Sequence, residues 1–142
     1  MKLQLREFSD VLTVLKGPLT DAAAAEKRKA ARINVTYRIE IHLVNNNVVS
    51  RSYTALARDI SLTGMGVLQG SLLPQGQELI VVLPRPSAPL YVCAVAMHTR
   101  WLADGVVAVG IEFTRVAEPS LTEQLLKNNK AAQAKIAQSV LQ

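Results

Sequence analysis

INVTYRIEIHL, the stretch at residues 33–43, alternates apolar and polar side chains with the two-residue period of an extended chain. The apolar positions that share one face are Ile33, Val35, Tyr37, Ile39, Ile41 and Leu43. The positions on the other face are Asn34, Thr36, Arg38, Glu40 and His42. This pattern predicts a β-strand with one side in a core and the other side in water.

Five further strand patterns follow this first one along the chain. They are RSYTALARDI (51–60), GMGVLQ (64–69), ELIVVLP (78–84), LYVCAVAMHTRW (90–101) and VVAVGIEFTRV (106–116). NNN at 45–47 and the pair Asp104 and Gly105 are typical turn residues. No helical pattern separates the strands, so we expect a mainly β fold, a six-stranded antiparallel barrel whose closure removes exposed edges.

The residues before the barrel predict a short helix. In FSDVLTVLKGP, Ser9 or Asp10 is a suitable N-cap, and Gly17 with Pro18 is a stop signal. The apolar face of this helix would consist of Phe8, Val11, Leu12 and Leu15. Since a low-complexity Ala-rich link follows, we assign residues 1–25 to an N-terminal leader and residues 26–118 to the barrel.

The residues after the barrel predict a C-terminal helix over 119–142. Ser120 and Glu123 have the spacing of a capping box directly before an apolar run. A stripe of apolar residues continues along it: Leu121, Leu125, Ala132, Ile136 and Val140. We expect the first two turns to dock on the barrel, and the sequence leaves open whether the rest pairs with a second copy as a homodimer.

Composition limits the class of protein. The 142 residues are 49% hydrophobic and 19% charged, which is typical of a globular domain. No apolar run reaches the roughly 20 residues of a transmembrane helix, and the single cysteine fits a reducing compartment. We therefore expect a soluble cytoplasmic protein, and the net charge of +5 favours an anionic partner.

Catalytic and metal-binding residues are scarce. Cys93 and His98 are five residues apart on one expected strand, so their side chains should point to opposite faces. His42 and His98 also lack a second strong ligand at metal-binding spacing. We expect Cys93 to be a small core residue and both histidines to be surface or rim groups. No catalytic residue, metal site or cofactor is assigned, and we do not expect an enzyme.

Two short segments remain, EKRKAAR at 26–32 and DISLTG at 59–64. Each alone is readily explained as a solvated charged face or an ordinary turn. Together they offer more, because Arg guanidinium groups clamp phosphate or the O6/N7 edge of guanine. A neighbouring carboxylate can accept hydrogen bonds from the guanine N1 and N2 donors. The combination of the two segments is therefore suited to a guanine nucleotide.

RKAAR with Arg28 and Arg32, followed by DISLTG with Asp59, Ser61 and Gly64, resembles the paired RxxxR and [D/N]xSxxG motifs of PilZ domains. The resemblance covers roughly residues 26–115 and includes the GxGV after the second motif, the later Trp101 and the closing VGIEF. It implies a six-stranded barrel with a trailing helix that binds the bacterial second messenger cyclic di-GMP.

The resemblance also implies a role for each matching residue. Arg28 and Arg32 would grip phosphate and the guanine edge, while Asp59, Ser61 and Gly64 would hold the ligand from the barrel surface. A basic residue before the first motif, here Lys27, is associated in the family with two stacked ligand molecules. The resemblance implies a receptor. We further expect binding to neutralise the basic cluster and to move the N-terminal segment, a change that a protein partner would recognise. Simple packing of the leader helix against the barrel is the alternative.

Two alternatives stay open at this stage. One is a PilZ-like scaffold that binds only protein, although all five motif residues are intact in this chain. The other is a small basic barrel that binds nucleic acid, but aromatic residues are only 4% of the chain and leave few platforms for stacking bases. We therefore do not expect a nucleic-acid partner.

Overall fold

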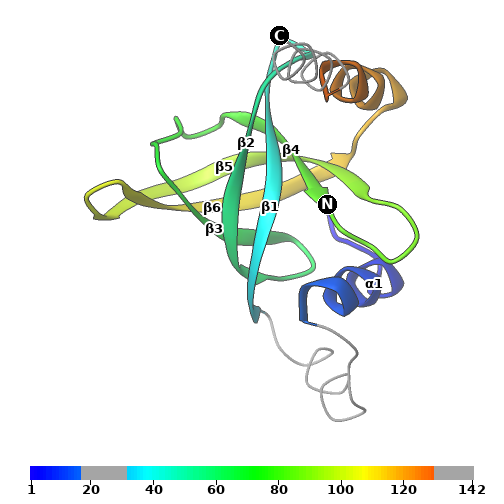
Figure 1. The fold of residues 1–142 in the computed structure, drawn as a ribbon, viewed down its shortest axis with the longest axis horizontal. Helices are drawn as coiled ribbons and strands as arrows, with labels where there is room; N and C mark the ends of the chain where they lie inside the picture. Colours follow the sequence, from blue (N-terminus) through cyan, green and yellow to red (C-terminus); the bar gives the residue numbers. More distant parts are fainter. Residues whose placement is uncertain (17–31, 130–142) are drawn as a thin grey trace, which may run out of the picture.

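A computed structural model describes residues 1–16 and 32–129 of the chain. Six antiparallel strands close into a barrel in the order β1-β2-β3-β6-β5-β4. The strands are β1 (Ile33–Asn45), β2 (Val48–Ile60), β3 (Gly64–Gln69), β4 (Glu78–Leu83), β5 (Leu90–Ala103) and β6 (Val106–Val116). The expectation of a six-stranded antiparallel barrel is therefore confirmed (Figure 1).

The hairpin between β1 and β2 follows directly from its sequence. Asn46 and Asn47 have φ angles of 51° and 64°, the left-handed conformation that a tight hairpin turn requires and that Asn tolerates. The hairpin pairs Asn45 with Val48 beside the turn and, beyond two register shifts, Asn34 with Asp59 at the far end of the strands. This register brings the beginning of β1 to the end of β2.

An N-terminal helix, α1 (Leu5–Lys16), closes the end of the barrel where β1 starts (Figure 1). Its four predicted apolar residues are all buried, and they belong to the same hydrophobic cluster as the barrel interior. The predicted N-cap at Ser9 or Asp10 is wrong, because the helix begins more than one turn earlier. The Glu7 carboxylate accepts a hydrogen bond from the Gln4 N–H at 3.1 Å, which is half of a capping box.

The C-terminal helix is described for residues 119–129 and packs on the outside of the barrel. Leu121 and Leu125 are buried there with Ile80 and Cys93, so the docking of its first turns is confirmed. The predicted cap at Ser120 is wrong, since the helix already begins at residue 119. Residue 119 is a proline, and its fixed φ angle suits the first position of a helix.

His42 is the exception on the polar face of β1. It was expected at the surface, but its side chain is 0% exposed. Its neighbour in the register is Ile80, part of the apolar cluster beneath the C-terminal helix. The His42 Nε2 atom lies 2.8 Å from the Glu40 carboxylate, and Nδ1 has no hydrogen-bond partner among the described residues. Docking of the C-terminal helix therefore changes one polar strand position into a buried one.

The expectation that Cys93 and His98 point to opposite faces is also wrong. The pairing of β5 with β6 is interrupted between Ala96 and His98, so a β-bulge shifts the alternation by one residue. Ala94 and Ala96 face the core, whereas Cys93 is buried on the outside of the barrel and His98 is exposed there. Five residues of strand still separate the two side chains by about 16 Å, so they form no pair.

Burial raises the pKa of two groups away from the turn between β2 and β3. The pKa of the Cys93 thiol is raised, so the thiol stays protonated and weakly nucleophilic. Burial also raises the pKa of Tyr53 to about 12, and its hydroxyl donates to the Gln69 side chain at 2.8 Å. Neither group has the ionisation that nucleophilic catalysis needs.

The described residues contain neither a membrane-spanning helix nor a cluster of metal ligands. Neither α1 nor the described part of the C-terminal helix is long and apolar enough to cross a membrane. Within residues 1–16 and 32–129, no three His, Cys, Asp or Glu residues cluster in a way that would hold a metal ion.

Candidate functional site

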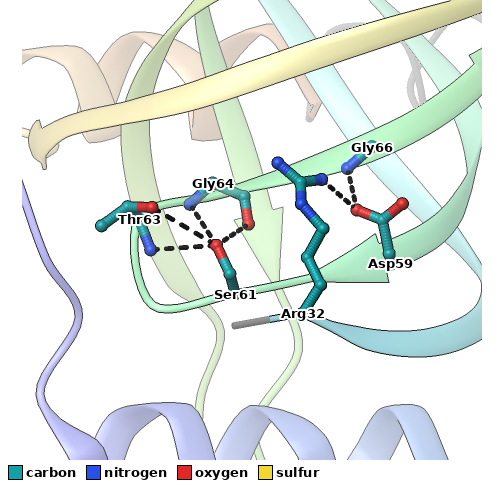
Figure 2. Close-up of polar contacts among 6 residues, drawn as sticks. All are labelled: Arg32, Asp59, Ser61, Thr63, Gly64 and Gly66. Atoms are coloured by element: carbon teal, nitrogen blue, oxygen red, sulfur yellow. Dashed lines mark hydrogen bonds and ion pairs between the residues drawn. The ribbon is translucent and has the colours of Figure 1, made fainter. Parts of the chain in front are cut away.

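The candidate site lies where β1 begins and where β2 turns into β3. Arg32 directly precedes β1, and the register pairs Asn34, two residues later, with Asp59 near the end of β2. Figure 2 shows the Arg32 side chain extending past the Ser61 turn toward Asp59. Strand pairing therefore brings together two motif residues that are 27 positions apart in the sequence.

Arg32 and Asp59 form an ion pair between the guanidinium Nη1 and the carboxylate Oδ1. The Arg32 side chain is 55% exposed and that of Asp59 is 24% exposed. The Asp59 Oδ1 atom also accepts a hydrogen bond from the Gly66 N–H at 3.0 Å, which fixes the carboxylate on β3 (Figure 2). Because an ion pair this exposed contributes little to stability, the arrangement keeps both charged groups available to a ligand.

Ser61 organises the turn between β2 and β3 from within. Its side chain is buried, and its hydroxyl accepts hydrogen bonds from the N–H groups of Thr63 and Gly64 at 3.3 and 3.2 Å (Figure 2). Its own N–H donates to the Gly64 carbonyl at 2.8 Å. These bonds satisfy the backbone donors of a tight turn, so the Ser61 hydroxyl is directed into the protein and holds the turn in shape.

Gly64 and Gly66 are required by close approaches inside the protein. A Cβ on Gly64 would lie 2.2 Å from the Ile111 carbonyl oxygen of β6, a contact that no side chain can make. A Cβ on Gly66 would lie 2.9 Å from the Asp59 carboxylate. The glycine of the second motif therefore allows β3 to pair with β6, and Gly66 leaves room for Asp59.

The turn is also bonded to the N-terminal segment and to β6. The Leu3 N–H donates to the Leu62 carbonyl at 2.7 Å, and Leu62 lies inside the DISLTG turn. The Phe113 N–H donates to the Thr63 carbonyl at 2.8 Å. Two backbone hydrogen bonds therefore join this turn to the chain before α1 and to the core strand β6.

The structure thus brings four predicted site residues to one turn, Arg32, Asp59, Ser61 and Gly64. Two predicted residues, Lys27 and Arg28, lie outside the described residues. Sequence reasoning did not assign Gly66 a role, although a second glycine two residues after Gly64 signals a close backbone approach at that position.

The paired groups have the chemistry to bind an anionic purine nucleotide. A guanidinium fork binds phosphate or the guanine O6/N7 edge in a bidentate manner, and a carboxylate accepts from amide-like N–H donors. Asp59 belongs to β2, whereas Arg32 directly precedes β1. Only Arg32 has a long, half-exposed side chain, so it is the group best able to change partner when a ligand arrives.

Comparison with known proteins agrees with these motifs. One similar solved structure is the inhibitor of motility MotI/DgrA from Bacillus subtilis, with 17% sequence identity and a TM-score of 0.46. The alignment covers 74% of this chain and 51% of that protein, so the chain spans about half of its length. A search of curated proteins finds no match. The model of the PilZ domain matches residues 26–128, which is more than half of the chain, and the chain therefore belongs to the PilZ domain family.

Proposed function

We propose that this chain is a receptor for cyclic di-GMP that has no catalytic activity and no cofactor. The observation that carries the proposal is the Arg32–Asp59 pair at the mouth of the Ser61 turn. Arg28 and Arg32 grip phosphate and a guanine edge, while Asp59 accepts from the opposite guanine edge. Ser61 and Gly64 act by holding the turn that presents Asp59.

The ion pair between Arg32 and Asp59 is formed before the ligand binds and is weak. Without ligand, Arg32 neutralises Asp59 and keeps both groups oriented toward the same space. When the ligand binds, its phosphate replaces Asp59 as the partner of the Arg32 guanidinium. The guanine N1 and N2 donors replace Arg32 as the partners of the Asp59 carboxylate. The exchange costs little free energy because an ion pair this exposed contributes at most about 1 kcal/mol.

The output of the receptor is a change in position of its N-terminal segment, which a protein partner recognises. The hydrogen bond from Leu3 to Leu62 supports this relay, because it joins the N-terminal segment to the turn that would contact the ligand. The segment also leads into Arg28 and Arg32, so closing these arginines on the ligand pulls on the chain that follows α1.

Two finer expectations belong to the same proposal. Lys27 precedes the first arginine motif and would favour two stacked ligand molecules over one. The C-terminal helix would provide the contact for a homodimer, in which exposed Leu126 is a candidate contact residue.

Calorimetric titration with cyclic di-GMP tests the receptor function. Arg28→Ala, Arg32→Ala and Asp59→Ala should each weaken binding by about 10-fold or more, because guanine contacts of this kind are worth about 1–3 kcal/mol. Arg51→Ala is a matched control, since it removes one positive charge from an exposed position of β2 away from the turn. The control should bind like the intact protein.

Two outcomes would contradict the proposal in different ways. Unchanged affinity in both Arg32→Ala and Asp59→Ala would refute the site. No heat from the intact protein would refute the receptor function and favour a scaffold that binds only protein. Displacement of cyclic di-GMP by unrelated RNA, with a steep salt dependence, would instead identify a nucleic-acid-binding barrel.

A further inference from the structure

Among the described residues, Nδ1 of His42 is the one buried side-chain polar atom that has no hydrogen-bond partner. The imidazole is 0% exposed, and its other nitrogen, Nε2, lies 2.8 Å from Oε2 of Glu40. Buried polar atoms are almost always paired in native proteins, so an unpaired one indicates strain or a functional constraint at its position. Water would pair with this nitrogen if it could reach the ring.

The C-terminal helix, described for residues 119–129, keeps water away from His42. The strand registers place His42 on the outer face of the barrel between Ser52 of β2 and Ile80 of β4. Ile80 in turn packs against Leu121 and Leu125 of the helix. The strands therefore form the floor beneath the imidazole, and the helix forms its cover.

The attachment of this helix to the barrel is small and partly polar. The Val49 N–H donates to Gln124 Oε1 at 2.9 Å, and Gln124 Nε2 donates to the Asn47 carbonyl at 3.0 Å. Asn128 Nδ2 donates to the Val49 carbonyl at 3.1 Å. The apolar part of the attachment is a cluster separate from the barrel core. The helix can therefore leave its position without opening the core, and these backbone groups would then bond to water.

A proton on His42 changes the balance between the docked and the detached position of the helix. An imidazolium donates from both nitrogens, whereas a neutral imidazole with its proton on Nε2 offers only a lone pair at Nδ1. Glu40 belongs to the same strand as His42 and its side chain is 44% exposed, so their contact does not require the helix. The Nδ1–H of the charged ring has no acceptor among the described residues under the helix, but it finds water once the helix detaches. Protonation therefore favours detachment.

The other charged groups around this face do not supply the missing partner. They are all exposed and lie on β2, β4, β6, the helix or the segment before it: Arg51, Glu78, Arg115, Glu118, Glu123 and Lys127. Three are basic and three are acidic, so their long-range effects on His42 largely offset one another, and salt screens each of them. Tyr91 and Cys93 of β5 carry no charge in the pH range in which an imidazole titrates, and burial raises the pKa of the Cys93 thiol further. The effect of the proton is therefore set by whether the helix covers Nδ1.

We propose that the C-terminal helix is a proton-controlled cover of the barrel, docked over neutral His42 and detached from protonated His42. Detachment exposes the apolar outer surface that Leu121 and Leu125 bury, which is made by Val44, Val49, Ile80 and Cys93. The docked position binds fewer protons than the detached one, so docking weakens as the pH falls through the range in which an imidazole titrates. This switch lies at the opposite end of β1 from Arg32 and does not depend on the proposed nucleotide binding.

Nuclear magnetic resonance of the intact chain measures the proton and the helix in one titration. From about pH 8 to about pH 5, the ring signals of His42 and the backbone amide signals of Leu121 and Leu125 should change with one common midpoint. The ratio of docked to detached helix should change by up to about tenfold per pH unit, the limit for one linked proton. Amides of the barrel core, such as Val67 and Val109, should stay in place, which distinguishes detachment from unfolding. Helix amides that stay in place while His42 titrates would overturn the proposal.

Two matched variants separate His42 from other titrating groups. His42→Leu cannot take up the proton, so its helix amides should remain unchanged over the same pH range. His98→Leu removes the other histidine of the chain, which is exposed on β5, and should keep the pH dependence of the intact protein. An unchanged pH profile in His42→Leu would assign detachment to another group and overturn the proposal, as would a helix that stays docked in the intact protein across the whole range. If His42→Leu does not fold, the titration of the intact protein alone decides.

Discussion

At the scale of single residues, the fold requires glycine at some positions and would tolerate alanine at others. Gly64→Ala would place a Cβ 2.2 Å from the Ile111 carbonyl oxygen, so β3 and β6 must separate. We expect a loss of about 1–3 kcal/mol in the free energy of unfolding, measured by urea denaturation. Gly70→Ala is the matched control, because its Cβ would meet no atom closer than 3.9 Å and the change should stay within about 0.5 kcal/mol. Equal stability of the two variants would show that β6 shifts without cost to make room for the Cβ added at position 64. If Gly64→Ala is destabilised as expected, its loss of ligand binding reports on the fold and does not by itself locate the ligand.

At the scale of elements, α1 is part of the barrel core. Leu12 is 0% exposed and belongs to the same cluster as the barrel interior, whereas Leu5 on the same helix is 55% exposed. We expect Leu12→Ala to lower the free energy of unfolding by about 2–5 kcal/mol and Leu5→Ala to change it by less than about 0.5 kcal/mol. Chemical denaturation followed by circular dichroism measures both. Similar values for the two variants would mean that α1 does not pack as described.

At the scale of the whole molecule, α1 and the barrel share one core, so a ligand bound at the turn is expected to stabilise the entire fold. Cyclic di-GMP at 100 times its dissociation constant should stabilise the protein by about 2.7 kcal/mol and raise the Tm on the order of 10 °C. Hydrogen exchange should slow at the amides of Val11 and Leu12 as well as in the turn at Ser61, because Leu3 and Leu62 join the two regions. Asp59→Ala should show neither effect. Protection confined to the turn would separate α1 from the site and contradict the proposed relay.

Local sequence signals predicted the strands well, because an alternating pattern and a tight turn depend on residues that are close in the chain. The turn at Asn46 and Asn47 is one such case. The same signals failed where another element intervenes. His42 is buried because the C-terminal helix covers its face of β1, and His98 faces outward because a bulge in β5 interrupts the alternation.

The sequence by itself determined the strand pattern, the family motifs and the identity of the charged groups that would meet a nucleotide. Only the tertiary structure decided that Arg32 pairs with Asp59, that Gly64 is needed by β6, and that Nδ1 of His42 is buried without a partner among the described residues. Alternation is a property of one strand, so it can be read along the chain. Registers, bulges and close backbone approaches arise between strands distant in sequence, and the barrel has to close before they exist.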